Sequence, residues 1–397
     1  MVTTTWGGLK PGKYEVGFRT ALRTDYSRHY GAPAAEAGVP RGFRPVLVAT
    51  WYPAAAAAGD APPLTYGDYL AVASADPALA PFATRLSEHN REATIRYGLA
   101  AEPEKLDEEG RRALAERERL PMRAVRDAPP AGGRFPVVFY HPGLGGSYED
   151  NGVLCEYLAS HGYTVASSAF PSEDGLFVGV DWDLDRSVKD LGFLMNVAAA
   201  DPGVDVTRVG AVGQSYGGQA LMAWSSEANS PVRAVVSLDS TVDYAATDEP
   251  RLENLARPLS RAENVTAAWL LFAVKDRVPN WARWDYLTHT PRWYAGTAHL
   301  DHNDFTSQGM IGTALRKAGP PVEAGQVRQR YEAVCELARH FLDGYVKGDE
   351  EALDLLRRQA DAQRTPQDAP DAGPTTEPPL TLAFVPPSPA APADEGA

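Results

Sequence analysis

Apolar runs alternate with amphipathic segments along the chain from about residue 134 onward. The run FPVVFY (135–140) is nearly continuous, as expected for a strand that is buried on both faces of a parallel sheet. In contrast, the segment 184–199 places Val188, Leu191 and Leu194 on one helical face. This alternation predicts βαβ units, and therefore a mostly parallel sheet with helices on both faces. The predicted strands are 135–140, 163–170, 208–212, 232–238, 267–274 and 292–296, and the predicted helices are 150–161, 184–199, a helix from Tyr216, and 327–346.

The pattern differs at both ends of this regular region. Residues 13–53 contain the β-prone runs KYEVGFRT and RPVLVATWYP, which predict two strands at one edge of the sheet. Residues 64–125 read as a helical insertion, which either covers the site as a lid or decorates the surface. We therefore expect one domain over 1–362. The tail 363–397 is rich in Pro and Ala and is expected to be disordered, although its island LTLAFV could dock as a strand.

Composition narrows the possible partners. The formal net charge is −14, which argues against nucleic acid and anionic membranes as partners, because both need clustered Lys and Arg. The sequence shows neither the pattern of a secretory signal nor an apolar run of the roughly 18–20 residues needed to span a membrane, so a cytoplasmic protein is expected. Cys155 and Cys335 are expected to be buried free thiols, with a single disulfide as the alternative. The oligomeric state stays open.

The candidate nucleophile is Ser215, in the pattern Gly213-Gln214-Ser215-Tyr216-Gly217. Only glycines two residues before and after the serine let neighbouring chains approach so tight a turn. The pattern follows a predicted strand and precedes a predicted helix. In that position the turn exposes the serine oxygen above the sheet, and the helix N-terminus adds positive potential. An ordinary glycine-rich turn between strand and helix is the alternative interpretation.

A second glycine-rich turn, HPGLGG (141–146), follows the strand 135–140. A turn at that position can direct a backbone N–H toward the nucleophile. We therefore predict an oxyanion hole formed by the N–H groups of Leu144 and Tyr216. A structural turn is the alternative, and a phosphate-binding loop is disfavoured because the G-K-[ST] ending is missing.

The general base should be a histidine late in the chain. His299 follows the strand 292–296 at its carboxyl end, where open α/β sheets place their ligands, and it is the predicted base. His302 is interpreted as structural. The segment HLDHND also offers a metal site as an alternative, built from His299, Asp301, His302 and Asp304, but a local cluster rarely completes a coordination shell.

Two aspartates at strand ends could orient the base. Asp239 follows the run VRAVVSL and Asp276 follows AAWLLFAV. Both satisfy the chain order of serine, then acid, then histidine. Either carboxylate could stabilise the imidazolium that forms during turnover, and spacing alone leaves both open.

These segments resemble the α/β-hydrolases related to platelet-activating-factor acetylhydrolase, which overlap with dienelactone-hydrolase-like esterases. The likeness covers roughly 10–53 and 121–345 and lies in FYHPGLGG, GQSYGG, VVSLDS and GTAHLDHNDF. In that family the acid follows the strand after the nucleophile helix, which implies Asp239 and leaves Asp276 as the alternative. Dienelactone hydrolases use a cysteine where this chain has Ser215, so their ring-opening substrates are not implied.

The expected function is hydrolysis of carboxylic esters with short or truncated acyl chains, through an acyl-enzyme on Ser215 and without a cofactor or metal. The expected partner is a small-molecule ester. A peptidase, thioesterase or lactonase using the same triad is the first alternative. A catalytically silent binding protein with the same fold is the second.

Overall fold

A computed structural model gives the structure of the protein. It describes most of the region that the sequence predicts to be folded. The described residues are 5–30, 42–56, 61–172, 183–240, 242, 255–274, 285–297, 300–314, 322–363 and 380–387.

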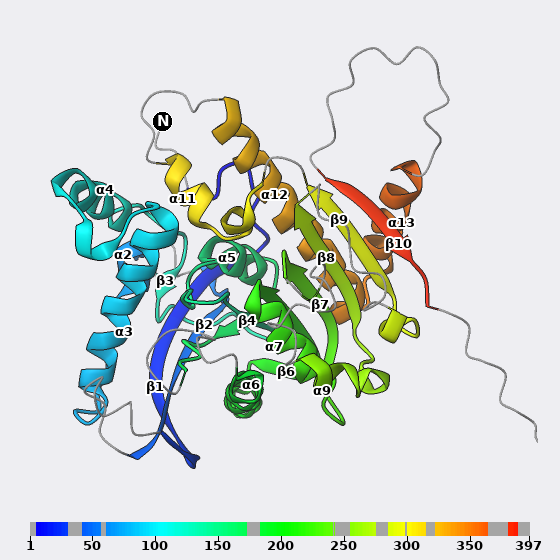
Figure 1. Ribbon diagram of the computed structural model, residues 1–397, viewed down its shortest axis with the longest axis horizontal. Helices are drawn as coiled ribbons and strands as arrows, with labels where there is room; N and C mark the ends of the chain where they lie inside the picture. The colour runs from blue at the N-terminus through cyan, green and yellow to red at the C-terminus, as the bar shows by residue number, and fades with distance from the viewer. Residues whose placement is uncertain are drawn as a thin grey trace, which may run out of the picture.

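The strands form a single ten-stranded sheet in the order β3-β1-β2-β5-β4-β6-β7-β8-β9-β10 (Figure 1). β2 is antiparallel to both of its neighbours and β10 is antiparallel to β9, whereas the other pairs are parallel. The predicted mostly parallel sheet is therefore confirmed, and the two predicted first strands form an antiparallel pair near one edge. The strands are β1 (Glu15–Tyr30), β2 (Gly42–Ala54), β3 (Val125–Arg126), β4 (Phe135–His141), β5 (Thr164–Ser167), β6 (Val204–Gln214), β7 (Val232–Leu238), β8 (Ala268–Val274), β9 (Arg292–Thr297) and β10 (Thr381–Val385).

Helices cover both faces of the sheet and give it two hydrophobic cores. Along β4, Val137 and Phe139 belong to one buried cluster and Val138 and Tyr140 to the other. Both faces are thus buried, which explains why the run FPVVFY is nearly continuous. The first cluster includes α6 (Leu184–Ala199) and α7 (Tyr216–Ser225), and the second includes α5 (Gly152–Ser160), α12 (Val322–Leu342) and α13 (Glu350–Gln363). The shorter helices of this region are α9 (Ala256–Leu259), η5 (Ala262–Asn264), η6 (Asp285–Leu287), η7 (His302–Phe305), α11 (Gln308–Ala314) and η8 (Asp343–Lys347).

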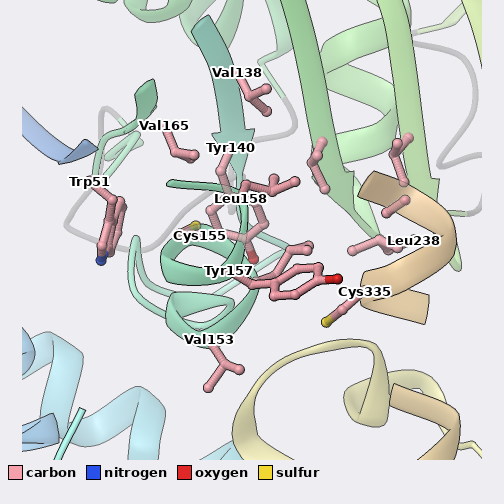
Figure 2. Close-up of a cluster of buried hydrophobic side chains, with 14 of the residues drawn as sticks. Trp51, Val138, Tyr140, Val153, Cys155, Tyr157, Leu158, Val165, Leu238 and Cys335 are labelled. Carbon is pink, nitrogen blue, oxygen red and sulfur yellow. The ribbon is translucent and has the colours of Figure 1, made fainter. Parts of the chain in front are cut away.

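Both cysteines lie in the second of these cores. Figure 2 shows Cys155 on α5 and Cys335 on α12, among Tyr157, Leu158 and Leu238. Both are free and buried, which confirms the predicted thiols. Burial raises the pKa of each thiol well above its ordinary value, so both stay protonated.

Residues 66–118 contain the helices of the predicted insertion. They are α2 (Tyr66–Leu70), α3 (Ala80–Ala93), η2 (Thr94–Gly98), η3 (Pro103–Lys105) and α4 (Glu108–Glu118). In Figure 1, α2, α3 and α4 lie together beside β1 and β3, at one edge of the sheet. None of the helices in the described ranges combines the length and apolar character that a membrane crossing requires.

A buried carboxylate ties the insertion to the core. The side chain of Glu156 on α5 accepts hydrogen bonds from Tyr69 Oη at 2.6 Å, Trp6 Nε1 at 2.7 Å and the backbone N–H groups of Arg123 and Ala124 at 2.9 and 2.8 Å. A buried carboxylate is costly unless its oxygens are satisfied, and four donors satisfy this one. The insertion is therefore anchored to the second core through Tyr69.

The C-terminal part of the chain adds a helix and a docked strand to the predicted core elements. The chain forms an additional helix, α13, and the island 380–385 docks as β10 within the tail that was expected to be disordered. Leu380 and Leu382 are buried, and Phe384 packs on Trp293 with ring centroids 4.3 Å apart. Gln363 at the end of α13 hydrogen-bonds to both Leu380 and Leu382. The apolar island LTLAFV therefore docks as a strand, which was the alternative that the sequence left open for it.

Truncation tests the docking of β10. Deletion of residues 380–397 should destabilise the protein by about 3 kcal/mol, because two buried leucines and an aromatic contact are lost. Thermal unfolding should then shift downward by roughly 5 °C or more. Deletion of 388–397 alone is the matched control and should leave Tm unchanged. An unchanged Tm after the longer deletion would contradict the docking.

Candidate active site

Ser215 lies in the tight turn between β6 and α7. Its backbone has φ +52° and ψ −116°, a conformation that a residue with a side chain rarely adopts. Over 209–226, every residue except Ser215 is buried. The turn is held by hydrogen bonds from Ser215 N to the Leu238 oxygen and from Gly218 N to the Ser215 oxygen, both of 3.0 Å. The strained turn thus leaves Ser215 as the one partly exposed residue of an otherwise buried segment.

The flanking glycines are required by close approach. A Cβ at Gly213 would lie 2.5 Å from the Gly217 carbonyl carbon, and a Cβ at Gly217 would overlap the carbonyl oxygen of His141. A Cβ at Gly143 would lie 3.2 Å from Ser215 Cβ. The glycines of the nucleophile turn and of the loop 141–146 therefore let these two segments pack directly on each other.

A buried carboxylate and a histidine are paired beside this turn. Asp239 follows β7, is fully buried and has φ +49°. Its Oδ2 lies 2.6 Å from Nδ1 of His302, and Val274 N donates a longer bond of 3.4 Å to Oδ1. An ionised carboxylate only accepts, so Nδ1 of His302 carries the proton and Nε2 is left as an acceptor. This is the tautomer that a general base requires.

His302 faces the residue that precedes the serine. Its Nε2 lies 3.4 Å from Nε2 of Gln214, which also donates to the His302 carbonyl oxygen at 3.3 Å. The side chain of His302 is 36% exposed, whereas that of Asp239 is completely buried. The imidazole therefore connects a buried carboxylate to the accessible side of the nucleophile turn.

The histidine of the observed pair differs from the expected one. His299, the predicted base, lies outside the described residues, so the structure does not place it. His302 was interpreted as structural, but it begins the turn η7 and bonds to Asp239. Asp301 and Asp304 form the capping box of this turn, which accounts for both carboxylates. The pattern D-x-x-D was the sequence signal for a turn that positions His302.

The alternative acid also lies outside the residues that the structure describes. Asp276 falls within 275–284, outside the described residues. Asp239 is described, and it occupies the end of the strand next to β6, as the sequence indicated. Of the two candidate acids, Asp239 is the one whose contact with a histidine is observed.

In the loop 141–146, the backbone N–H of Leu144 points away from the turn that the loop forms. Gly146 N donates to the Gly143 oxygen at 3.1 Å, and Gly145 takes φ +68°. In a trans peptide the N–H points opposite to the C=O. Because the Gly143 oxygen is turned inward by this bond, the Leu144 N–H points outward. The Tyr216 N–H belongs to the first residue of α7, at the positive end of the helix dipole.

His141 holds the start of this loop through hydrogen bonds and ring stacking. It is fully buried, its Nδ1 lies 2.8 Å from the Pro142 oxygen, and its Nε2 lies 3.0 Å from Ser187 Oγ. Its ring stacks on Phe170 at 3.9 Å. Burial lowers the pKa of His141 to about 4, so the imidazole is neutral near pH 7. His141 thus fixes the start of the loop.

Two adjacent buried carboxyls follow the loop, and sequence reasoning missed them. Ser147 Oγ lies 2.6 Å from Oε1 of Glu149 and 3.0 Å from Oδ1 of Asp150. A hydroxyl has one hydrogen, so two ionised carboxylates would leave one of these contacts between lone pairs. Burial and the mutual repulsion of the pair raise the pKa of Glu149 well above its ordinary value. We therefore assign a protonated Glu149 that donates to Ser147, which in turn donates to Asp150.

The variant Glu149→Gln tests this assignment. The pKa of this carboxyl group is higher in the folded chain than in the unfolded chain, so below its unfolded pKa the group stabilises the folded state. This stabilisation is lost as the pH rises toward the pKa of the folded state. Removing that ionisation should therefore make Glu149→Gln more stable than the parent protein by about 1–2 kcal/mol at pH 8. At pH 4 the two should be nearly equal. A destabilised variant whose deficit grows with pH would show that Glu149 is ionised.

Comparison with known proteins supports the architecture. No family model matches the sequence, and none of the curated proteins compared with it does either. The structure is similar to that of a ferulic acid esterase from Streptomyces cinnamoneus, with a TM-score of 0.59 and 21% sequence identity. The alignment covers 94% of this chain and 98% of the esterase chain. Together with the strand order and the strand–serine–helix turn, this likeness gives the chain an α/β-hydrolase fold.

Proposed function

We propose that the protein is a carboxylic ester hydrolase with Ser215 as its nucleophile, His302 as general base and Asp239 as the orienting acid. The observation that carries this proposal is the Asp239–His302 bond of 2.6 Å beside the strained, partly exposed Ser215. Acyl transfer requires this arrangement, in which a buried carboxylate is bonded to a histidine next to a serine.

The proposed reaction has two half-reactions. The Nε2 of His302 takes the proton of Ser215, whose oxygen attacks the ester carbonyl carbon, and the N–H groups of Leu144 and Tyr216 stabilise the oxyanion. The tetrahedral intermediate collapses to an acyl-enzyme, and His302 gives the proton to the leaving alcohol. Water then attacks the acyl-enzyme with His302 again as base, which releases the acid and regenerates Ser215. Asp239 stays ionised and stabilises the imidazolium throughout.

The ester class of this proposal draws on two likenesses. The similar solved structure is a ferulic acid esterase, and the sequence resembles esterases related to platelet-activating-factor acetylhydrolase. Both act on carboxylic esters, and the second supports short or truncated acyl chains. A panel of p-nitrophenyl esters of increasing acyl length, with methyl ferulate beside them, would measure this preference. Peptide and thioester substrates in the same panel would detect the alternative activities.

Labelling with a fluorophosphonate probe tests the nucleophile directly. The serine oxygen forms a bond to phosphorus and fluoride leaves, so one probe per chain should attach to Ser215, as peptide mass spectrometry would show. Ser215→Ala should abolish both labelling and ester hydrolysis. The partly exposed Ser74 offers a matched control, Ser74→Ala, which should label as the parent does. Absence of labelling on the parent protein would favour the silent binding protein.

A further inference from the structure

Resting on the proposed function, we further propose that the helical insertion is a fixed part of the active site. In this proposal Tyr97 and His89 are positioning residues that set the backbone of the loop 141–146 for stabilisation of the oxyanion. The insertion would then contribute to turnover through this loop, as distinct from a lid that opens and closes over the site.

Tyr97 holds the exposed tip of the loop. Its hydroxyl, on η2, donates to the carbonyl oxygen of Leu144 at 3.1 Å. The same hydroxyl lies 2.7 Å from the place where a Cβ of Gly145 would be, so it packs directly on the next residue. Leu144 is the one exposed residue of the loop, with 38% of its surface accessible. This hydrogen bond therefore restrains the backbone at Leu144, the exposed residue that would otherwise be the freest part of the loop.

His89 holds the other end of the loop from α3. Its Nε2 lies 3.2 Å from the carbonyl oxygen of Gly146, and the side chain is buried. Burial lowers the pKa of His89 to about 4, so the ring is neutral near pH 7. A carbonyl oxygen only accepts, so the Nε2 of His89 must carry the proton. The insertion thus supplies a second directed donor to the loop.

The bonds together fix successive peptide planes. The Gly143 carbonyl is held by Gly146 N, the Leu144 carbonyl by Tyr97, and the Gly146 carbonyl by His89. The next amide, Ser147 N, donates to Asp150 at 2.9 Å. Since each peptide is planar, a fixed carbonyl also fixes the N–H of the following residue. Rotation of the Leu144–Gly145 peptide would disturb the neighbouring Leu144 N–H, the proposed oxyanion donor.

The insertion is also fastened to the segment that carries His302. Arg117 on α4 is 1% exposed and donates to both the backbone oxygen and Oε1 of Gln308, at 2.7 and 2.6 Å. Gln308 begins α11, just after the turn η7. Its Nε2 donates to Tyr66 of the insertion at 2.8 Å. The insertion therefore contacts both the loop 141–146 and the chain that follows the turn η7.

Tyr97→Phe is the decisive variant, because it keeps the ring and removes one donor. We expect kcat to fall by about tenfold to a hundredfold with KM nearly unchanged, since the loop acts on the transition state. The inhibition constant of a trifluoromethyl ketone, which forms an oxyanion on the serine, should rise by a similar factor. Tyr163→Phe is the matched control, because its hydroxyl bonds to Asp343 at the far end of the sheet. It should lower Tm without changing kcat.

A pair of variants at His89 separates positioning from packing. His89→Gln keeps a donor of similar reach and should retain most activity, whereas His89→Leu should show the kcat loss of Tyr97→Phe. A KM change alone, or equal effects of both His89 variants on Tm with kcat intact, would overturn the positioning role. These outcomes presuppose that the parent protein labels at Ser215 and hydrolyses esters. If it does neither, the proposed function fails first.

Discussion

His302→Ala should lower kcat/KM for ester hydrolysis by about four to six orders of magnitude, with substrate binding largely retained. The expectation follows from the pair of Asp239 and His302, in which Nδ1 carries the proton and Nε2 is available as base. Without the imidazole, the Ser215 hydroxyl keeps its proton and the leaving alcohol receives none. Steady-state kinetics on a p-nitrophenyl ester would measure the loss, and circular dichroism would verify the fold.

His299→Ala is the informative comparison. The two histidines lie three residues apart in the sequence, and of the two only His302 has a described position. If His302 is the base, His299→Ala should retain activity within about an order of magnitude, because it removes a neighbour rather than the proton acceptor. If His299→Ala is inactive and His302→Ala is active, the general base is His299, as the sequence predicted.

The distinction between these histidines shows where sequence reasoning ends. The strand before them and the serine turn follow from local patterns, because apolar runs and glycine spacing constrain the backbone within a few residues. Which histidine reaches Asp239 depends on how the chain turns after β9. The capping box of Asp301 and Asp304 sets that turn, and its consequence for a partner over sixty residues away is not local.

The same limit applies to the polar contacts around the site. Periodicity predicted helices in the insertion, yet nothing local indicates that Tyr97 reaches Leu144 or that Arg117 reaches Gln308, which is 191 residues away. Glu149 reads in sequence as an ordinary acidic residue. Its protonation follows from burial beside Asp150, which only the folded chain creates. The architecture could therefore be predicted from the sequence, whereas the long-range polar contacts around the site could not.

Asp239→Asn should produce the other large loss, about four orders of magnitude in kcat/KM. The asparagine is nearly isosteric, so the buried site should keep its shape. However, it removes the charge that stabilises the imidazolium and can offer N–H₂ where the carboxylate oxygen accepted from His302. With the wrong tautomer, Nε2 carries the proton and cannot act as base. KM should change little, because Asp239 is fully buried behind the imidazole.

Asp276→Asn makes the same chemical change at the other candidate acid, two residues after β8 in the sequence, which makes it the matched control. It should leave kcat/KM within about an order of magnitude of the parent value if Asp239 is the acid. The reverse result, with Asp276→Asn inactive and Asp239→Asn nearly silent, would move the acid to the later strand. In that case the bond between Asp239 and His302 would be structural, and the His302→Ala and His299→Ala results would identify the base independently. The four variants together therefore assign both partners of Ser215 from kinetics alone.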